Sequence, residues 1–360
     1  MLDKSSSLLL IVLFSLLTLS TLAASVLAQS TILPQDTIGS TSSLPMTQEE
    51  VMARVRNSRA KGLDFDDVAA EIDRRGINFE VDTPFANLIQ FMRASVVTNA
   101  LWRADDRRKA LTAKPNNIAA DEVQNVSKRE LNSLPFIEQA RAVALAYVDS
   151  LPNFVVREQV QRYERAIRGS WKLGDYLELA VSYSSEKGEE IKLKLQNGKA
   201  SSLTFDQVGG LTSTGQFAGQ LALLFRPESK AEFIEQEQIN FYGQPCVIYS
   251  YRVAMKNSYH QLKVGKAQVT TGYRGRIFIQ RNSKQILRME VESVDIPPDF
   301  PISEATSVVD FGWVKIGDKD FLLPVSGQVS LTSKQDHYTA LNCITFNKYG
   351  KFETDVKIVE

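Results

Sequence analysis

Residues able to do chemistry are few in this chain. The two histidines, His260 and His337, lie in or beside segments with strand periodicity, and neither has a second metal-ligating residue at a fixed spacing. The sequence also has no G-x-S-x-G turn, the usual setting of a nucleophilic serine in α/β-hydrolases. Histidines in such positions are more often surface or satisfied sheet residues. We therefore expect no catalytic residue, no metal site and no cofactor.

The two cysteines, Cys246 and Cys343, fall at inward-facing positions of expected strands. They do not form a C-x-x-C motif or another ligand spacing. In an exported chain a single disulfide between them is one interpretation, and two buried free thiols are an equally good one, because free cysteine is commonly buried. A catalytic cysteine is a much weaker third interpretation.

Two further patterns resemble sites. Glu235 and Glu237 stand two apart in an expected strand, which would place both carboxylates on one side, and paired carboxylates serve glycoside hydrolysis. The segment Gly210–Phe217 has the G-x-x-x-x-G spacing of a phosphate loop, but Gln216-Phe217 replaces the Lys-Ser/Thr that would contact phosphate and magnesium. A solvated sheet face and a helix-capping turn are the simpler interpretations.

Charge composition excludes some partners. The chain has 360 residues with 42 Lys+Arg and 42 Asp+Glu, so its formal net charge is zero. A neutral chain without runs of like charge has no field that favours nucleic acid or an anionic membrane. We expect no nucleic-acid partner, and contact with a membrane only at its periphery or through the N-terminal segment.

That N-terminal segment carries a targeting pattern. Lys4 precedes the apolar stretch Leu8–Ala28, and Val26 and Ala28 are suitable residues at positions −3 and −1 of a signal-peptidase site. We expect residues 1–28 to be a cleaved secretory signal and the protein to be periplasmic or extracellular. The alternative is an uncleaved membrane anchor, since about 20 apolar residues can span a bilayer. Residues 29–46, rich in Ser, Thr and Pro, are expected to be a disordered spacer.

Residues 47–104 have helical periodicity. Thr47 and Glu50 have capping-box spacing, and Thr83 with Pro84 begins a similar segment about 36 residues later, which predicts a small helical domain with a weak internal repeat. Residues 105–133 are charged and poor in apolar residues, so we expect a linker with some helical tendency.

Residues 134–360 are expected to form one antiparallel domain. After an amphipathic helix at 135–150 the apolar period changes to two and stays there almost to the end, with 246–254 and 259–269 among the expected strand pairs. A second helix is expected at 215–225. The predicted fold class is α+β: a long, curved antiparallel sheet, or unclosed barrel, with two helices in its concave face, preceded by a small all-α region.

This order of elements resembles the LolA/LolB/RseB-like unclosed-barrel superfamily over about residues 135–360. The segments that carry the resemblance are "INFYGQPCVIYSYRV" (Ile239–Val253) and "YRGRIFIQRNSKQILRMEVE" (Tyr273–Glu292). The whole chain also resembles a group of uncharacterised secreted bacterial proteins that share "LTSTGQF", "FPISEA" and "FLLPV", a group that brings no known activity. The chain departs from the LolB type because no cysteine near the N-terminus could be lipidated, and from the carrier fold because of the added helices 47–104.

A curved sheet that is apolar on one face can form the floor of a binding site for an apolar ligand, and such a site needs no catalytic group. The leading hypothesis is a secreted or periplasmic, non-catalytic binding protein that holds a lipid, an acyl chain or another apolar ligand on the concave face, in lipid or lipoprotein handling or sensing at the cell envelope. Each candidate lining residue would serve equally well as ordinary core beneath the helices. The candidates are Leu179, Val181, Leu193, Ile277, Ile279, Leu287, Met289 and Val291.

Two alternatives come from other classes of protein. One is a protein-interaction or sensor module with a filled core, whose envelope partner binds helices 47–104. The weaker one is a hydrolase that uses Glu235 and Glu237 or an unrecognised Ser-His-Asp triad. A cavity large enough for an acyl chain would favour the binding protein, and a polar cleft with those carboxylates would favour the hydrolase.

Overall fold

The computed structural model describes residues 9–12, 44–115, 132–204, 207–213, 217 and 219–352, with residues 9–12 and 213 described by their backbone alone. The predicted signal apart from residues 9–12, most of the spacer and the second half of the predicted linker therefore lie outside the described residues. In the described part, no helix is long and apolar enough to cross a membrane.

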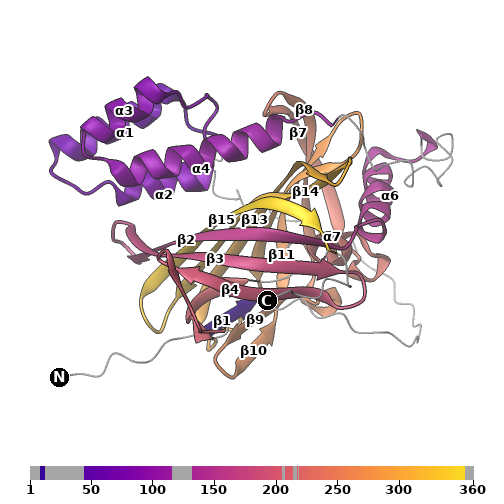
Figure 1. Ribbon diagram of the computed structural model, residues 1–360. Coiled ribbons are helices and arrows are strands. Elements are labelled where there is room, and N and C mark those ends of the chain that lie inside the picture. The colour runs from indigo at the N-terminus through magenta and orange to yellow at the C-terminus, as the bar shows by residue number, and fades with distance from the viewer. Residues whose placement is uncertain are drawn as a thin grey trace, which may run out of the picture.

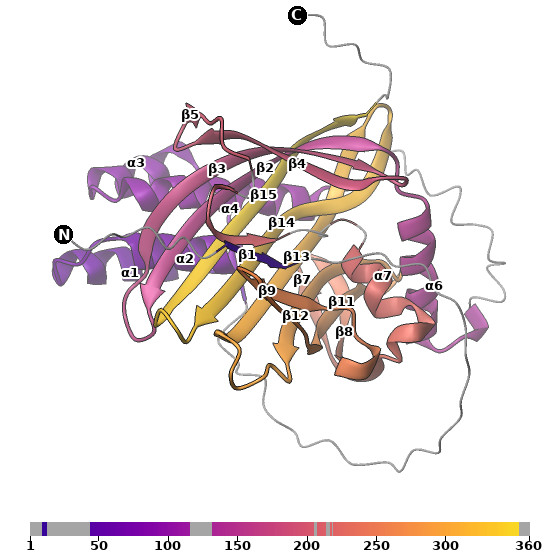
Figure 2. The ribbon, with the colours of Figure 1, turned by 90° about the horizontal axis from the view of Figure 1, so that it is seen from below.

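The main feature is an eleven-stranded antiparallel sheet that does not close on itself, with the order β5-β4-β3-β2-β15-β14-β13-β12-β11-β8-β7. Its strands are β2 (Phe154–Ala166), β3 (Lys172–Ser184), β4 (Gly188–Gln196), β5 (Lys199–Ala200), β7 (Glu232–Phe241), β8 (Gln244–Val253), β11 (Gly272–Gln280), β12 (Ile286–Val294), β13 (Ile302–Ile316), β14 (Lys319–Ser333) and β15 (Tyr338–Lys351). The sheet is strongly curved (Figures 1 and 2). The predicted α+β class with an unclosed barrel is confirmed.

Four helices lie together behind the convex face of the sheet (Figure 2). They are α1 (Gln48–Ala60), α2 (Asp66–Arg75), α3 (Thr83–Phe91) and α4 (Ser95–Thr112). The predicted start of the first helix is confirmed, because the Thr47 side chain accepts a hydrogen bond from the Glu50 backbone N–H.

Helix α4 corrects the predicted boundary between helices and linker. It continues eight residues past 104, so residues 105–112 are helix and not linker. The reason is tertiary: Arg107 of this segment is buried and its Nη2 lies 2.7 Å from Oδ2 of Asp310 in β13. At the end of α4, the side chain of Gln244 donates to the backbone oxygen of Leu111 at 3.0 Å. Charged residues that look like a solvated linker in the sequence are paired with the sheet.

The concave face is covered by different elements. They are α6 (Phe136–Asp149), α7 (Gly219–Phe225) and a small four-stranded sheet with the order β10-β9-β1-β6. The small sheet contains β1 (Leu9–Val12), β6 (Gly210–Ser213), β9 (Gln261–Val264) and β10 (Ala267–Thr270). Figure 2 shows β1 and β9 in front of the curved sheet, with α6 and α7 toward one end.

One predicted strand pairing, of 246–254 with 259–269, is wrong. The segment 246–254 belongs to β8, which pairs with β7 and β11, whereas 259–269 contributes the separate hairpin β9–β10 of the small sheet. Alternation of apolar residues identifies a strand, but it does not name the neighbour, because strands adjacent in the chain can leave the sheet and pair elsewhere.

Candidate binding site on the concave face

The eight residues predicted to line the binding site are all buried, with an exposed fraction between 0% and 5%. Leu179, Val181 and Leu193, on β3 and β4, belong to one apolar cluster. The other five, on β11 and β12, belong to a second cluster. Tyr147 and Val148 of α6 pack against both clusters and so connect them. The structure therefore places these residues in two adjoining groups that are fully covered.

The cover of the first cluster is the small sheet together with an aromatic group. Leu211 of β6 and Leu262 and Val264 of β9 are buried in this cluster. Phe154 lies at the centre of the aromatic group, with its ring centroid 5.2 Å from those of Phe217 and Tyr183. Aromatic pairs at such distances add stabilisation beyond their buried area.

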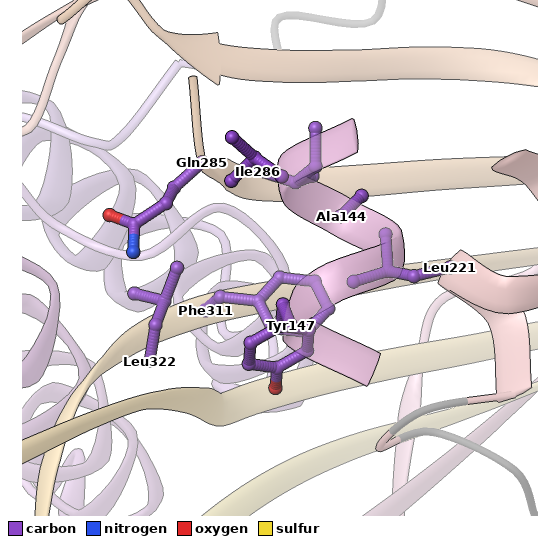
Figure 3. A pocket seen from close by; sticks show the side chains of 8 residues that line it. Ala144, Tyr147, Leu221, Gln285, Ile286, Phe311 and Leu322 are labelled. Atoms are coloured by element: carbon purple, nitrogen blue, oxygen red, sulfur yellow. The ribbon is translucent and has the colours of Figure 1, made fainter. Parts of the chain in front are cut away.

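The cover of the second cluster is the helix pair α6 and α7. Figure 3 shows the cavity at this place, where Tyr147 and Ala144 of α6 and Leu221 of α7 face Phe311 and Leu322 of the sheet. The cavity has room for about one water molecule, far less than an acyl chain needs. With the cover in this position, this part of the concave face is filled.

In the described part of the chain, helices α6 and α7 contact the sheet through apolar and aromatic side chains and through a cation–π contact of Arg141 with Phe233 of β7. Arg141 of α6 donates to the backbone oxygen of Phe225 in α7 at 2.8 Å, which joins the two helices to each other. Among the described residues no hydrogen bond joins either helix to the eleven-stranded sheet, whereas the buried ion pair Arg107–Asp310 joins α4 to it. The concave cover is thus attached by a different kind of contact from the convex helices.

Unpartnered polar groups lie under this cover. The hydroxyl of Tyr147 is buried and has no hydrogen-bond partner among the described residues, and the same holds for Oε1 of Gln220 in α7. Native proteins leave few buried polar side-chain atoms unpaired, so such atoms call for an explanation such as a bound molecule.

The sequence reasoning missed Glu158, a buried carboxyl group of the concave face. Its side chain lies in β2 and is 5% exposed. Burial, and secondarily the charge of Glu189, raise the pKa of Glu158 to about 8, so the group is largely protonated at neutral pH. The sequence could have revealed this burial, because Glu158 falls on the same side of the strand as Phe154, Val156 and Val160, which alternate as inward-facing apolar residues.

His260 is a buried residue that makes a hydrogen bond within the fold. It is 5% exposed, and its Nε2 lies 2.8 Å from Oγ of Ser293 in β12. Burial lowers the pKa of His260 to about 4, which keeps the ring neutral. His337 is exposed in the turn before β15, with a φ of 53°. Of the two histidines that the sequence predicts to be bystanders, one is therefore buried and the other exposed.

A disulfide is excluded, because Cys246 and Cys343 are both free and buried. Their strands, β8 and β15, have four strands between them. Five strand spacings of about 4.8 Å each far exceed the ~7 Å limit between the Cα atoms of a disulfide. Burial raises the pKa of the Cys246 thiol to about 12, so it is not a reactive thiolate.

The predicted carboxylate pair is also wrong. The register of β7 against β8 shifts between Glu235 and Glu237, so that Glu235 lies opposite Tyr249 and Glu237 opposite Ile248. Adjacent residues of β8 point to opposite faces, so this β-bulge turns the two carboxylates away from each other. Glu235 accepts a hydrogen bond from the Tyr249 hydroxyl at 2.7 Å. Within Gly210–Phe217, Gly210–Ser213 is strand β6 and not a phosphate loop; residues 214–216 lie outside the described part.

Comparison of the chain with known proteins finds matches among solved structures. No family model and no curated protein matches the chain. Among solved structures, a DUF1329 family protein from Desulfovibrio piger matches with 10% identity and a TM-score of 0.29, over 62% of this chain and 96% of that one. A putative outer membrane lipoprotein-sorting protein domain from Vibrio parahaemolyticus matches with 9% identity and a TM-score of 0.28, over 63% and 94%.

A LolA superfamily protein from Nitrosomonas europaea matches with 8% identity and a TM-score of 0.25, over 61% of this chain and 97% of that one. At identities of 8–10% and TM-scores of 0.25–0.29 these matches carry no argument about ligand or activity.

Proposed function

We propose that the protein is an exported, non-catalytic binding protein of the cell envelope that holds an apolar ligand between the concave face and its cover. The observation that carries the proposal is the attachment of α6 and α7. These helices contact the sheet through apolar surface and a cation–π contact of Arg141 with Phe233, and they make no hydrogen bond or ion pair with it among the described residues. The Tyr147 hydroxyl beneath them has no hydrogen-bond partner in the described part of the chain. Apolar contacts are non-directional, so a ligand with an apolar body can replace them without leaving a hydrogen bond broken.

The ligand enters by displacing this cover, because the existing cavity has room for only about one water molecule. The acidic groups of the concave face restrict the chemistry of the ligand. Glu158 and Glu189 are acidic, and no cation lowers the pKa of Glu158. An anionic head group is therefore disfavoured there, whereas a neutral group can accept a hydrogen bond from Tyr147 or from protonated Glu158.

The first test is organic extraction and mass spectrometry of protein that was expressed with export and purified without detergent. Binding of N-phenyl-1-naphthylamine, a neutral apolar fluorophore, is then measured by titration. We expect either a co-purified lipid or saturable probe binding. Ala144→Leu, which fills the cavity beneath α6, should weaken probe binding at least five-fold while the circular dichroism spectrum is unchanged.

A matched pair of variants tests the polar contact. Tyr147→Phe removes the unpartnered hydroxyl and should weaken retention of the natural ligand without loss of stability. Tyr163→Phe removes a hydroxyl on the convex side that donates to Asp73 at 2.7 Å, and should lower stability by about 1 kcal/mol without affecting the ligand. Protein that carries no lipid and does not bind the probe would refute the proposal.

One observation favours the alternative of a partner bound through helices 47–104. Phe91, at the end of α3, is 82% exposed, and Leu88 on the same helix is 46% exposed. Exposed aromatic residues are enriched where proteins contact each other. Co-purification from envelope extracts that is lost with Phe91→Ser, at unchanged stability, would support this alternative.

A further inference from the structure

The small sheet on the concave face is completed by the chain's own N-terminal segment. Strand β1 pairs in parallel with β6 over four residues, from Leu9 opposite Gly210 to Val12 opposite Ser213. On its other edge β1 is antiparallel to β9, with Leu10 opposite Val264. Without β1, strands β6 and β9 would face each other across a slot one strand wide, about two strand spacings or roughly 9.6 Å.

The β6 wall of this slot is held in place by side chains of the large sheet. Asn342 of β15 donates from Nδ2 to the backbone oxygen of Leu211 at 2.7 Å. Arg162 of β2 donates from Nη2 to the same oxygen at 3.3 Å. Both contacts are independent of β1, so this wall does not need an occupant to keep its position.

The β9 wall is also held independently of β1. Strand β9 forms a four-residue antiparallel ladder with β10. His260, which precedes β9, is fixed to Ser293 of β12, and its backbone oxygen accepts from the Thr271 N–H at 3.0 Å. The slot is therefore preformed, and its two edges present backbone groups that require hydrogen-bond partners.

The two faces of the slot differ in polarity. Leu211, Leu262 and Val264 are buried against the cluster that contains Leu179, Val181 and Leu193. On the other side of β9, Gln261 and Lys263 are only partly buried. Successive residues of a strand point to opposite faces. An occupant therefore directs every second side chain onto the apolar cluster and the others toward polar groups.

We propose that this slot is a strand-addition site that takes an extended segment of a second polypeptide, parallel to β6 and antiparallel to β9, with apolar residues at alternate positions. The segment Leu9–Val12 occupies the site in the chain that retains its N-terminus, and removal of that segment makes the site available. This inference goes beyond the proposed function, because the slot lies between β6 and β9 and not under α6 and α7. An acyl chain fits the apolar face, but it cannot satisfy the backbone edges of β6 and β9.

The experiment uses the full chain, expressed with its N-terminus retained, and a fluorescent peptide that carries Leu-Leu-Ile-Val between lysines. Leu10→Pro prevents β1 from pairing, because proline lacks the backbone N–H and disrupts a central strand. We expect the peptide to bind Leu10→Pro at least ten-fold more tightly than the wild-type chain, as measured by fluorescence anisotropy. Leu17→Pro, five residues after Leu9–Val12 in the sequence, should leave the affinity at the wild-type level.

Two controls locate the peptide. The same peptide with alternate backbone nitrogens methylated should not bind, because it cannot donate to the strand edges. A cysteine placed in the peptide at the position equivalent to Val12 should form a disulfide with Ser213→Cys in the Leu10→Pro background, and not with Gln268→Cys on the outer strand β10.

Equal binding of the methylated peptide, or equal affinity for Leu10→Pro and wild type, would overturn the strand-addition site. If the peptide fails but N-phenyl-1-naphthylamine still binds, the inference falls while the proposed apolar binding function stands. If both fail, the proposed function falls as well.

Discussion

At the scale of single residues, Glu158 is a carboxyl group buried among the apolar residues of β2. Its pKa is raised to about 8 in the folded protein, above the ordinary value of 4.5. The folded state therefore binds more protons than the unfolded state between these values, and stability falls as the pH rises from about 4.5 to 8. In Glu158→Gln this loss, about 5 kcal/mol, should be absent. Urea unfolding at a series of pH values measures it, and parallel curves for both proteins would contradict the assigned burial.

His260 should act in the opposite direction. Its pKa is lowered to about 4 by burial, below the ordinary 6.5, so the unfolded state binds the extra proton first. The stability contributed by the neutral ring is complete above pH 6.5 and is lost as the pH falls toward 4. We expect His260→Gln, which keeps a polar group near Ser293, to lose about 2 kcal/mol less than wild type over this range. Thermal unfolding at pH 4.5 and 7 compares the two proteins, and equal losses would show that His260 is accessible to protons.

At the scale of elements, the contact between β11 and β12 depends on one glycine. A Cβ atom at Gly275 would lie 1.8 Å from the backbone oxygen of Glu290 and 2.7 Å from the hydroxyl of Tyr251. The first neighbour is backbone and cannot move without opening the ladder, so Gly275→Ala should cost about 3 kcal/mol. Gly265→Ala, at a φ of 56° and with nothing within 4 Å, should cost only about 1 kcal/mol from backbone strain. Equal costs in urea unfolding would mean that β11 and β12 pair less closely.

Strand positions were predictable because alternation is a local signal. Phe154–Ala166 and the β3–β4 hairpin are visible as alternating apolar residues, and the structure confirms them. The bulge at Gln236 was not predictable, because one inserted residue leaves the alternation of its neighbours nearly unchanged while it reverses the face of Glu237. The eight proposed lining residues were predictable as buried, but whether they bind a ligand stays a prediction.

The elements that the sequence reasoning missed depend on contacts between distant segments. Residues 105–112 look like a solvated linker because the partner of Arg107 is about 200 residues away, at Asp310. Strand β6 is only four residues long, and its pairing partners come from the N-terminal segment. Such short strands have no periodicity of their own and form only where neighbouring edges supply hydrogen bonds.

At the scale of the whole molecule, the two faces of the sheet are covered in chemically different ways. On the convex side, Tyr163 and Arg103 both donate to Asp73 of α2, at 2.7 and 2.6 Å. On the concave side, α6 and α7 make no such contacts with the sheet among the described residues. A cover attached by ion pairs and hydrogen bonds moves as one body with the sheet, while a cover attached without them can separate from it. The proposed ligand site therefore belongs on the concave side.

The same difference predicts how the molecule unfolds. Burial alone would raise the pKa of Asp310, but Arg288 and Arg107 lower it to about 2, so the carboxylate is charged and joins α4 to the sheet. Asp310→Ala leaves two buried guanidinium groups without their partner and should cost about 3–5 kcal/mol. Glu292→Gln, which breaks the more exposed pair with Arg274 at 3.0 Å, should cost less than about 1 kcal/mol.

In wild type, far-ultraviolet circular dichroism and tryptophan fluorescence should report one coincident transition, because Trp102 lies in α4 and Trp313 in β13 and both respond when the network breaks. In Asp310→Ala the two signals should separate, with the helices melting first. Separate transitions already in wild type would show that helices 47–104 are an independent domain, which would favour their role as a partner-binding module. A single transition that persists in Asp310→Ala would show that apolar contacts alone join the helices to the sheet.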